Sequence, residues 1–135
     1  MSPLRKLSIG IIGLGLIGGS VARSLRYRFP DIKLIAHDVN PSNTDIALRD
    51  RTINAFDSLE NIAKLSDVLV LAMPPLCNIE TIQKLPKIVN RDTIITDVSS
   101  VKLAVDAVVA LTPKSFQSNF VMGHPLSGSE QSGYV

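Results

Sequence analysis

Cysteine is almost absent from this chain of 135 residues, and its scarcity excludes several kinds of chemistry. The single cysteine, Cys77, cannot form a disulfide within the chain or supply a CxxC metal or redox motif. Because no base stands beside Cys77 in the sequence, a semi-buried structural thiol is favoured over a nucleophile. We therefore expect a cytoplasmic protein, kept in a reducing compartment, with no metal site.

Long apolar segments and a large charge excess are also missing. The first residues lack the apolar core of a signal peptide, and the apolar run at residues 7–17 is interrupted by glycines and too short to cross a bilayer. The formal net charge is only +2. The basic residues Arg23, Arg26 and Arg28 fall on one expected helix, where a solvated face explains them better than a nucleic-acid patch. We expect neither a membrane nor a nucleic-acid partner.

What the chain does contain is a repeated order of strand, turn and helix. With 45% hydrophobic residues, it can bury roughly two thirds of its unfolded surface as one domain over residues 1–135. The alternation predicts an α/β fold, a doubly wound parallel sheet covered on both faces. Expected strands lie at residues 7–12, 33–37, 52–55, 67–73, 93–98 and 120–123. The helices between them are expected at residues 16–28, 42–51, 58–65, 78–85 and 100–112.

A glycine motif follows the first expected strand. Gly13, Gly15 and Gly18 have the GxGxxG spacing, just before a helix that begins near Leu16. Gly13 permits a tight turn, Gly15 lets the backbone approach a pyrophosphate, and Gly18 lets the helix pack closely on the strand. Unpaired amides at Leu16 and Ile17 would then face the phosphates. Such glycines also occur in ordinary turns, but their position between strand and helix predicts a Rossmann dinucleotide site.

Asp38 closes the second expected strand, 20 residues after Gly18 (38 − 18). At this spacing, the acidic residue of a Rossmann fold accepts hydrogen bonds from the adenosine ribose hydroxyls. A carboxylate there would repel the extra phosphate of NADP, so NAD is the favoured cofactor. The alternative for Asp38 is a plain turn residue, and the nearby Arg49 and Arg51 could weaken the preference for NAD. His37 is expected to be structural.

Other candidate residues also follow expected strands, at the edge where open α/β sheets bind ligands. Met73 and Pro74 would lie beside the nicotinamide half of the cofactor, and Ser99 is a further cofactor-binding candidate. Ser99 or Ser100 would also cap the next helix. His124 follows the last strand and is suited to exchange a proton near neutral pH, although a histidine in such a place is often only structural.

Three motifs together resemble the N-terminal domain of prephenate or arogenate dehydrogenases, the oxidoreductases of tyrosine biosynthesis. They are GLGLIGGS at residues 13–20, DVSSVK at residues 97–102 and GHPLSGSEQSG at residues 123–133. Many dehydrogenases share the first motif, whereas the second and third are more specific, and the resemblance spans essentially the whole chain. It implies a small-molecule substrate and NAD-dependent oxidative decarboxylation of prephenate to 4-hydroxyphenylpyruvate, or of arogenate to tyrosine.

The resemblance also implies roles for individual residues. His124 would take the proton from the ring hydroxyl as the hydride leaves, and Ser100 would hold the hydroxyl and imidazole in register while Ser99 caps the helix. Glu130 matches an acidic position near the mouth of the family's active site, although a loop carboxylate is more often simply solvated. Lys102 is expected on the exposed side of its helix rather than against the substrate.

Members of that family continue for roughly another domain, a mostly helical part that forms the homodimer and supplies basic groups for the substrate. This comparison predicts that the chain is an excised or truncated N-terminal domain, with the C-terminal helical domain absent, that binds NAD but turns over prephenate poorly. Two alternatives remain open. Another Rossmann NAD(P)-dependent reductase would leave the HPLSGSE stretch unexplained, and a non-catalytic NAD-sensing module would leave the serine and histidine without a role.

Overall fold

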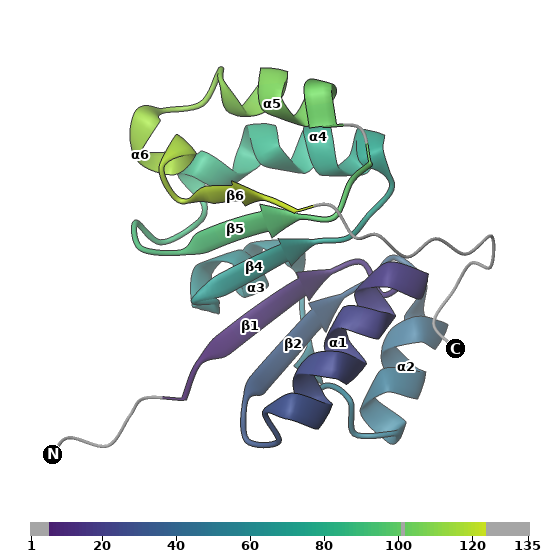
Figure 1. The fold of residues 1–135 in the computed structure, drawn as a ribbon. Coiled ribbons are helices and arrows are strands. Elements are labelled where there is room, and N and C mark those ends of the chain that lie inside the picture. Colours follow the sequence, from purple (N-terminus) through teal and green to yellow (C-terminus); the bar gives the residue numbers. More distant parts are fainter. Residues whose placement is uncertain (1–5, 101, 124–135) are drawn as a thin grey trace, which may run out of the picture.

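The structure, a computed structural model, describes residues 6–100 and 102–123. Figure 1 shows one parallel sheet of six strands in the order β3-β2-β1-β4-β5-β6. The strands are β1 (Ser8–Ile12), β2 (Lys33–His37), β3 (Ala55–Phe56), β4 (Val68–Leu71), β5 (Ile94–Asp97) and β6 (Phe120–Met122). This order confirms the doubly wound sheet, and it brings β1 and β4 together at the centre, where the order of the strands reverses.

Helices cover both faces of the sheet (Figure 1). They are α1 (Leu16–Arg28), α2 (Pro41–Arg49), α3 (Leu59–Leu65), α4 (Pro75–Lys84), α5 (Lys102–Val109) and α6 (Lys114–Gln117), and a 3₁₀ turn, η1 (Leu85–Lys87), follows α4. Because successive strand residues point to opposite faces, Ile11 packs in the core beneath α1 and α2, whereas Ile12 packs in the core beneath α3, α4 and α5. Both side chains are fully buried.

The third strand lies later than expected. Residues 52–55 were expected to form it, but Thr52 and Ile53 instead donate backbone hydrogen bonds to the carbonyl of Ala47 in α2. Arg51 has a φ of 64°, so the chain turns sharply where α2 ends. These residues therefore complete the end of α2, and the strand begins only at Ala55.

Helices α4 and α5 differ from the expectation at their ends. Helix α4 starts at Pro75 rather than Asn78, because a proline fits the first helical position, where no amide is needed. Cys77 lies beside the buried face of α4 and is exposed, so the expectation of a semi-buried thiol is wrong. Helix α5 ends at Val109 rather than at residue 112, and Leu111, which lies beyond its end, is 85% exposed.

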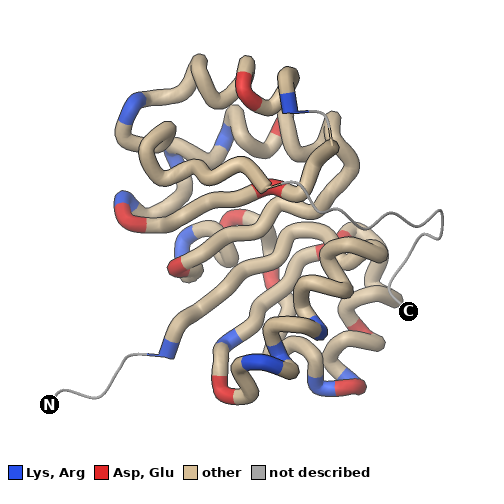
Figure 2. Tube along the Cα trace, viewed as in Figure 1, with Lys and Arg blue, Asp and Glu red and all other residues tan. Residues whose placement is uncertain are grey.

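Charged residues lie mainly on the helices and turns, while the strands carry few of them (Figure 2). Arg26 departs from the expected solvated helix face. Its guanidinium donates to the carbonyls of Pro30, Ile32 and Thr52 and to Oδ1 of Asn54, at 2.6–3.1 Å. Arg26 therefore ties α1 to the segments that lead into β2 and β3. Among the residues the structure describes, no helix is long and apolar enough to cross a membrane.

Candidate functional site

The glycine motif forms the turn between β1 and α1. Gly13 has a φ of 102°, and a Cβ on it would lie 2.7 Å from the carbonyl oxygen of Ala72. A Cβ on Gly18 would overlap the carbonyl oxygen of Gly13, so helix α1 crosses the turn at backbone contact. By contrast, no described atom lies within 4 Å of the Cβ position of Gly15. Two glycines are thus required by the fold itself, and the third leaves open space at the surface of the turn.

The start of α1 faces that open space. Gly15 is the N-cap residue, with no side-chain cap within the described chain, and the first turn of α1 holds no acidic residue. The first amides of a helix have no acceptor inside it, and they carry its positive dipole end. The amides of Leu16 and Ile17 are therefore suited to bind an anion such as a pyrophosphate.

Asp38 reaches the same turn from the end of β2. Its Oδ2 accepts a 2.6 Å hydrogen bond from the amide of Leu14, inside the glycine motif, and its Oδ1 accepts a 2.8 Å bond from the amide of Asn40. The second bond is the one expected of a turn residue, whereas the first joins residues 24 positions apart. Asp38 therefore fixes the glycine turn as well as lying at the edge of the site.

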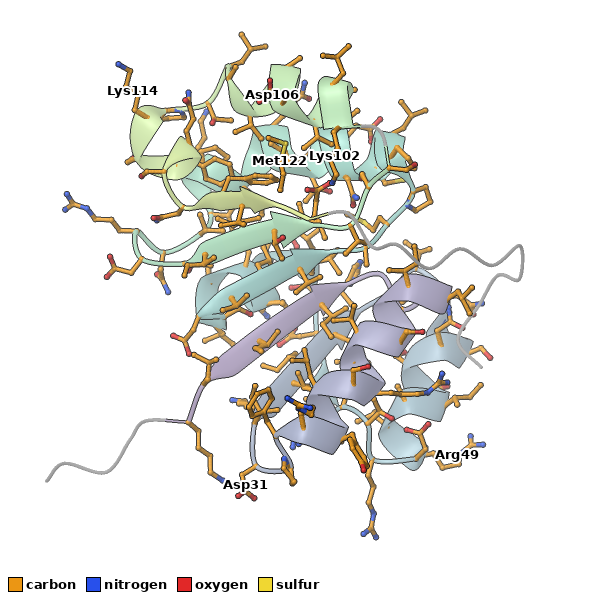
Figure 3. The ribbon with its side chains drawn as sticks, viewed as in Figure 1. Asp31, Arg49, Lys102, Asp106, Lys114 and Met122 are labelled. Carbon is orange, nitrogen blue, oxygen red and sulfur yellow. The ribbon has the colours of Figure 1, made fainter. Side chains whose placement is uncertain are left out.

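Arg49 and Arg51 do not lie near Asp38. Helix α2 begins at Pro41, close to Asp38, and runs away from the carboxyl edge of the sheet for its whole length of 9 residues. Figure 3 shows Arg49 at the end of the molecule where Asp31 lies, beside the start of β2. The helix separates the two arginines from Asp38 by roughly 13 Å along its axis. The path of α2 therefore gives no support to the idea that Arg49 weakens the effect of the carboxylate, and the preference for NAD stays a prediction.

The segments that follow β4 and β5 lie side by side. Leu71 and Asp97 pair at the ends of these strands, and the amide of Val98 donates to the carbonyl of Leu71 at 3.1 Å. Met73 is half-buried and Pro74 is exposed in the first segment. In the second segment Ser99 is buried and Ser100 is exposed. The structure thus brings the four expected residues to one edge of the sheet.

Within the described residues, the side chain of Ser99 bonds to helix α4 and not to α5. Its Oγ accepts a 2.8 Å hydrogen bond from Nδ2 of Asn78, and its amide donates to Oδ2 of Asp97 at 3.0 Å. Because Val101 lies outside the described residues, the capping of this helix by Ser99 or Ser100 stays a prediction. Sequence reasoning missed Asn78, because a buried asparagine inside a helix gives no local signal of its partners.

Asp97 and Lys102 form an ion pair that was also not expected. Nζ of Lys102 lies 2.8 Å from Oδ2 of Asp97, and the Asp97 side chain is fully buried while that of Lys102 is 29% exposed. Lys102 therefore points back toward the end of β5 (Figure 3) instead of lying on the exposed side of α5. Oδ1 of Asp97 is buried and has no hydrogen-bond partner in the described chain.

Two expected site residues, His124 and Glu130, lie outside the described residues, as does Val101. The last described residue before His124 is Gly123, whose amide donates to the carbonyl of Asp97 at 3.1 Å. His37, expected to be structural, places Nδ1 3.1 Å from the carbonyl oxygen of Asp57, and its own carbonyl accepts from the amide of Gly13. Asp57 follows β3, and bonds from Asn61 and from the amide of Ser58 lower the pKa of its carboxyl.

Comparisons with known proteins show what this chain is similar to. The prephenate dehydrogenase of Bacillus subtilis (strain 168) is 32% identical over 131 residues, which cover 95% of this chain and 35% of that protein. Among solved structures, prephenate dehydrogenase from A. aeolicus in complex with hydroxyphenyl propionate and NAD+ matches with a TM-score of 0.82 and 30% identity, over 98% of this chain and 46% of that one. Synechocystis arogenate dehydrogenase matches with a TM-score of 0.77 and 28% identity, over 95% of this chain and 44% of that one.

This chain therefore spans between 35% and 46% of the length of these three relatives. The family model described as "Prephenate dehydrogenase, nucleotide-binding domain" matches residues 21–135, which is most of the chain. Together with the glycine turn and the sheet order, this match shows that the chain belongs to the prephenate dehydrogenase family and corresponds to its nucleotide-binding domain.

Proposed function

We propose that this chain binds NAD as the cofactor domain of an enzyme that oxidises and decarboxylates prephenate or arogenate in tyrosine biosynthesis. The observation that carries the proposal is the open space at Gly15, which faces the uncapped start of α1 and lies beside a turn held by Asp38. Gly13 and Gly18 are required by backbone packing, but packing alone does not require a glycine at residue 15. A ligand that approaches the backbone there supplies the reason.

The residues present fit a dinucleotide. The amides of Leu16 and Ile17 would hold the pyrophosphate, and Asp38 would accept hydrogen bonds from the adenosine ribose. Each Asp38 oxygen can accept two hydrogen bonds and accepts one from a backbone amide, so acceptor capacity remains for the ribose. The same negative charge disfavours the additional phosphate of NADP, and no arginine at the end of α2 compensates it. NAD is therefore the proposed cofactor.

The nicotinamide end would lie at the segments after β4 and β5, near Met73, Pro74 and Ser99. When bound there, NAD supplies a hydride acceptor. We assign His124 the role of general base for the substrate hydroxyl, because imidazole exchanges a proton near neutral pH. Ser100, exposed at this edge, would orient that hydroxyl, and Glu130 would lie near the substrate entrance. The additional length of the relatives would carry the groups that bind the substrate carboxylates and form a homodimer.

Calorimetric titration of this chain with NAD and NADP tests the cofactor. The wild-type chain should bind NAD saturably and more tightly than NADP. Asp38→Ala should weaken NAD binding by about tenfold or more, since it removes a charged hydrogen bond of about 1.5–3 kcal/mol. Absence of saturable binding to either nucleotide would contradict the proposal.

The catalytic assignment needs a polypeptide that also carries the additional length seen in the relatives. In that protein, His124→Gln should abolish prephenate oxidation while NAD affinity stays unchanged, and Ser100→Ala should lower kcat about 100-fold. If both variants kept full prephenate oxidation, the roles assigned to His124 and Ser100 would be rejected. If His124→Gln and Ser100→Ala both left the function unchanged and only Asp38→Ala removed it, the protein would be an NAD-sensing module.

A further inference from the structure

The two segments that would flank the nicotinamide are residues 72–74 after β4 and residues 98–100 after β5. One backbone hydrogen bond, from Val98 to Leu71, joins them directly. Beyond this bond the two chains diverge, because one enters α4 at Pro75 and the other leads to α5 at Lys102. Their separation at Met73 and Ser99 must therefore be set by something else.

Asn78 lies between the two segments. Its side chain is fully buried in the first turns of α4. Its Oδ1 accepts a 3.1 Å hydrogen bond from the amide of Met73, and its Nδ2 donates to Oγ of Ser99 at 2.8 Å and more weakly to the carbonyl of Leu71 at 3.4 Å. One amide side chain thus binds both segments at once. A buried amide with these partners is costly to replace, since apolar atoms satisfy none of them.

Ser99 is fixed from two directions. Asn78 holds its side chain, and the carboxylate of Asp97, itself paired with Lys102, accepts a hydrogen bond from its amide. Only 4% of Ser99 is exposed, so its hydroxyl faces Asn78 rather than the surface where a cofactor would lie. Ser100, the next residue, is exposed. The position of Ser100 therefore depends on how Ser99 is held.

We infer that Asn78 is a positioning residue that sets the separation of residues 72–74 and 98–100, so that Met73 and Ser100 lie on either side of the nicotinamide ring. Ser99 acts through Asn78 and does not contact the cofactor by its side chain. This inference rests on the proposed function, since it assigns the nicotinamide to this edge of the sheet. It adds a residue to the site for which the GxGxxG motif and the strand ends give no indication.

The test compares NAD with ADP-ribose, which has the same adenosine and pyrophosphate but no nicotinamide. The wild-type chain, Asn78→Ala, Ser99→Ala and the double variant are titrated with both ligands. Each single substitution should weaken NAD binding about tenfold and leave ADP-ribose binding within about twofold, the effect of losing roughly one net hydrogen bond on the nicotinamide side only. The double variant should bind NAD no less tightly than the weaker-binding single variant, because both substitutions break the same hydrogen bond.

A buried polar residue at the opposite edge of the sheet provides the matched control. Thr93 is 2% exposed, and its Oγ1 donates to the carbonyl of Ser66 at 3.0 Å. Thr93→Val should lower thermal stability without changing the ratio of the NAD and ADP-ribose dissociation constants. This control separates a loss of general stability from a specific change at the nicotinamide side.

Several results would overturn the inference. Equal weakening of both ligands, or no change in either, would show that Asn78 has no positioning role. Additive losses of about 100-fold in the double variant would show that Ser99 acts on the cofactor independently. If Asn78→Ala does not fold, Ser99→Ala alone decides. An unchanged ratio of its NAD and ADP-ribose dissociation constants overturns the inference, and a tenfold change supports it. A wild-type chain that binds neither ligand would instead contradict the proposed function, and this inference with it.

Discussion

We expect single residues in the glycine turn to have separable roles, with Gly15 as the one that a ligand would approach. A Cβ on Gly15 meets no described atom within 4 Å, so Gly15→Ala should change the free energy of unfolding by less than about 1 kcal/mol. The added methyl would occupy the surface that a pyrophosphate approaches, and NAD binding should weaken about 100-fold. Chemical denaturation and calorimetry of the same variant measure both effects.

Gly18→Ala is the matched comparison for that variant. Its added methyl would overlap the carbonyl oxygen of Gly13, so the helix must move away from β1. We expect a loss of about 3 kcal/mol or more in the free energy of unfolding. A Gly18→Ala chain as stable as wild type, or a Gly15→Ala chain that binds NAD normally, would refute this division of tasks.

The ion pair between Lys102 and Asp97 joins helix α5 to strand β5. Lys102→Met should destabilise the chain by about 3 kcal/mol, because it leaves a fully buried carboxylate without its cation. The double variant Asp97→Asn with Lys102→Met should recover part of that loss, since the unpaired charge is then removed. Urea denaturation of the two variants measures the difference, and equal stability of both would contradict a role for the unpaired charge.

Asp57 lies at the start of α3, and its contribution to the stability of the fold should depend on pH. Hydrogen bonds from Asn61 and from the amide of Ser58 lower the pKa of its carboxyl, so the charged form is favoured in the folded chain. This contribution to stability is fully present above the unfolded pKa, about 4, and is lost as the pH falls through the lower folded pKa. The difference in Tm between wild type and Asp57→Asn should be constant from about pH 7 to 5 and shrink below about pH 4. A difference that grows on acidification would have the wrong sign.

At the scale of the whole molecule, nucleotide binding and turnover should separate. The chain spans only 35–46% of the length of the relatives compared above, so most of the length of those proteins lies beyond the matched part. This chain alone should bind NAD but oxidise prephenate at well below the roughly 1–1,000 per second that is ordinary for enzymes. Absorbance of NADH at saturating prephenate measures this rate. Turnover within that range would contradict the prediction.

The order of the strands, the glycine turn and the position of Asp38 could all be predicted from the amino-acid sequence. These features depend on local patterns, because apolar runs mark strands and fixed spacing marks the motif. The expected bounds of β2 agree with the structure at both ends. Ser58, the first residue of the helix expected at 58–65, is the N-cap of α3 and accepts a hydrogen bond from the amide of Asn61. The family resemblance was likewise readable from short motifs, and the family comparison confirms it.

The contacts between polar side chains that are distant in sequence could be identified only from the fold. Arg26 reaches carbonyls and an amide up to 28 positions away, and Asn78 reaches Ser99 across 21 positions. Helix α2 carries Arg49 away from Asp38, although the two are close in sequence. No local pattern encodes such pairs, because each depends on how separate strands and helices come together in the sheet. The sequence could therefore indicate where a nucleotide is proposed to bind. The contacts that hold residues 72–74 and 98–100 in place could be identified only from the fold.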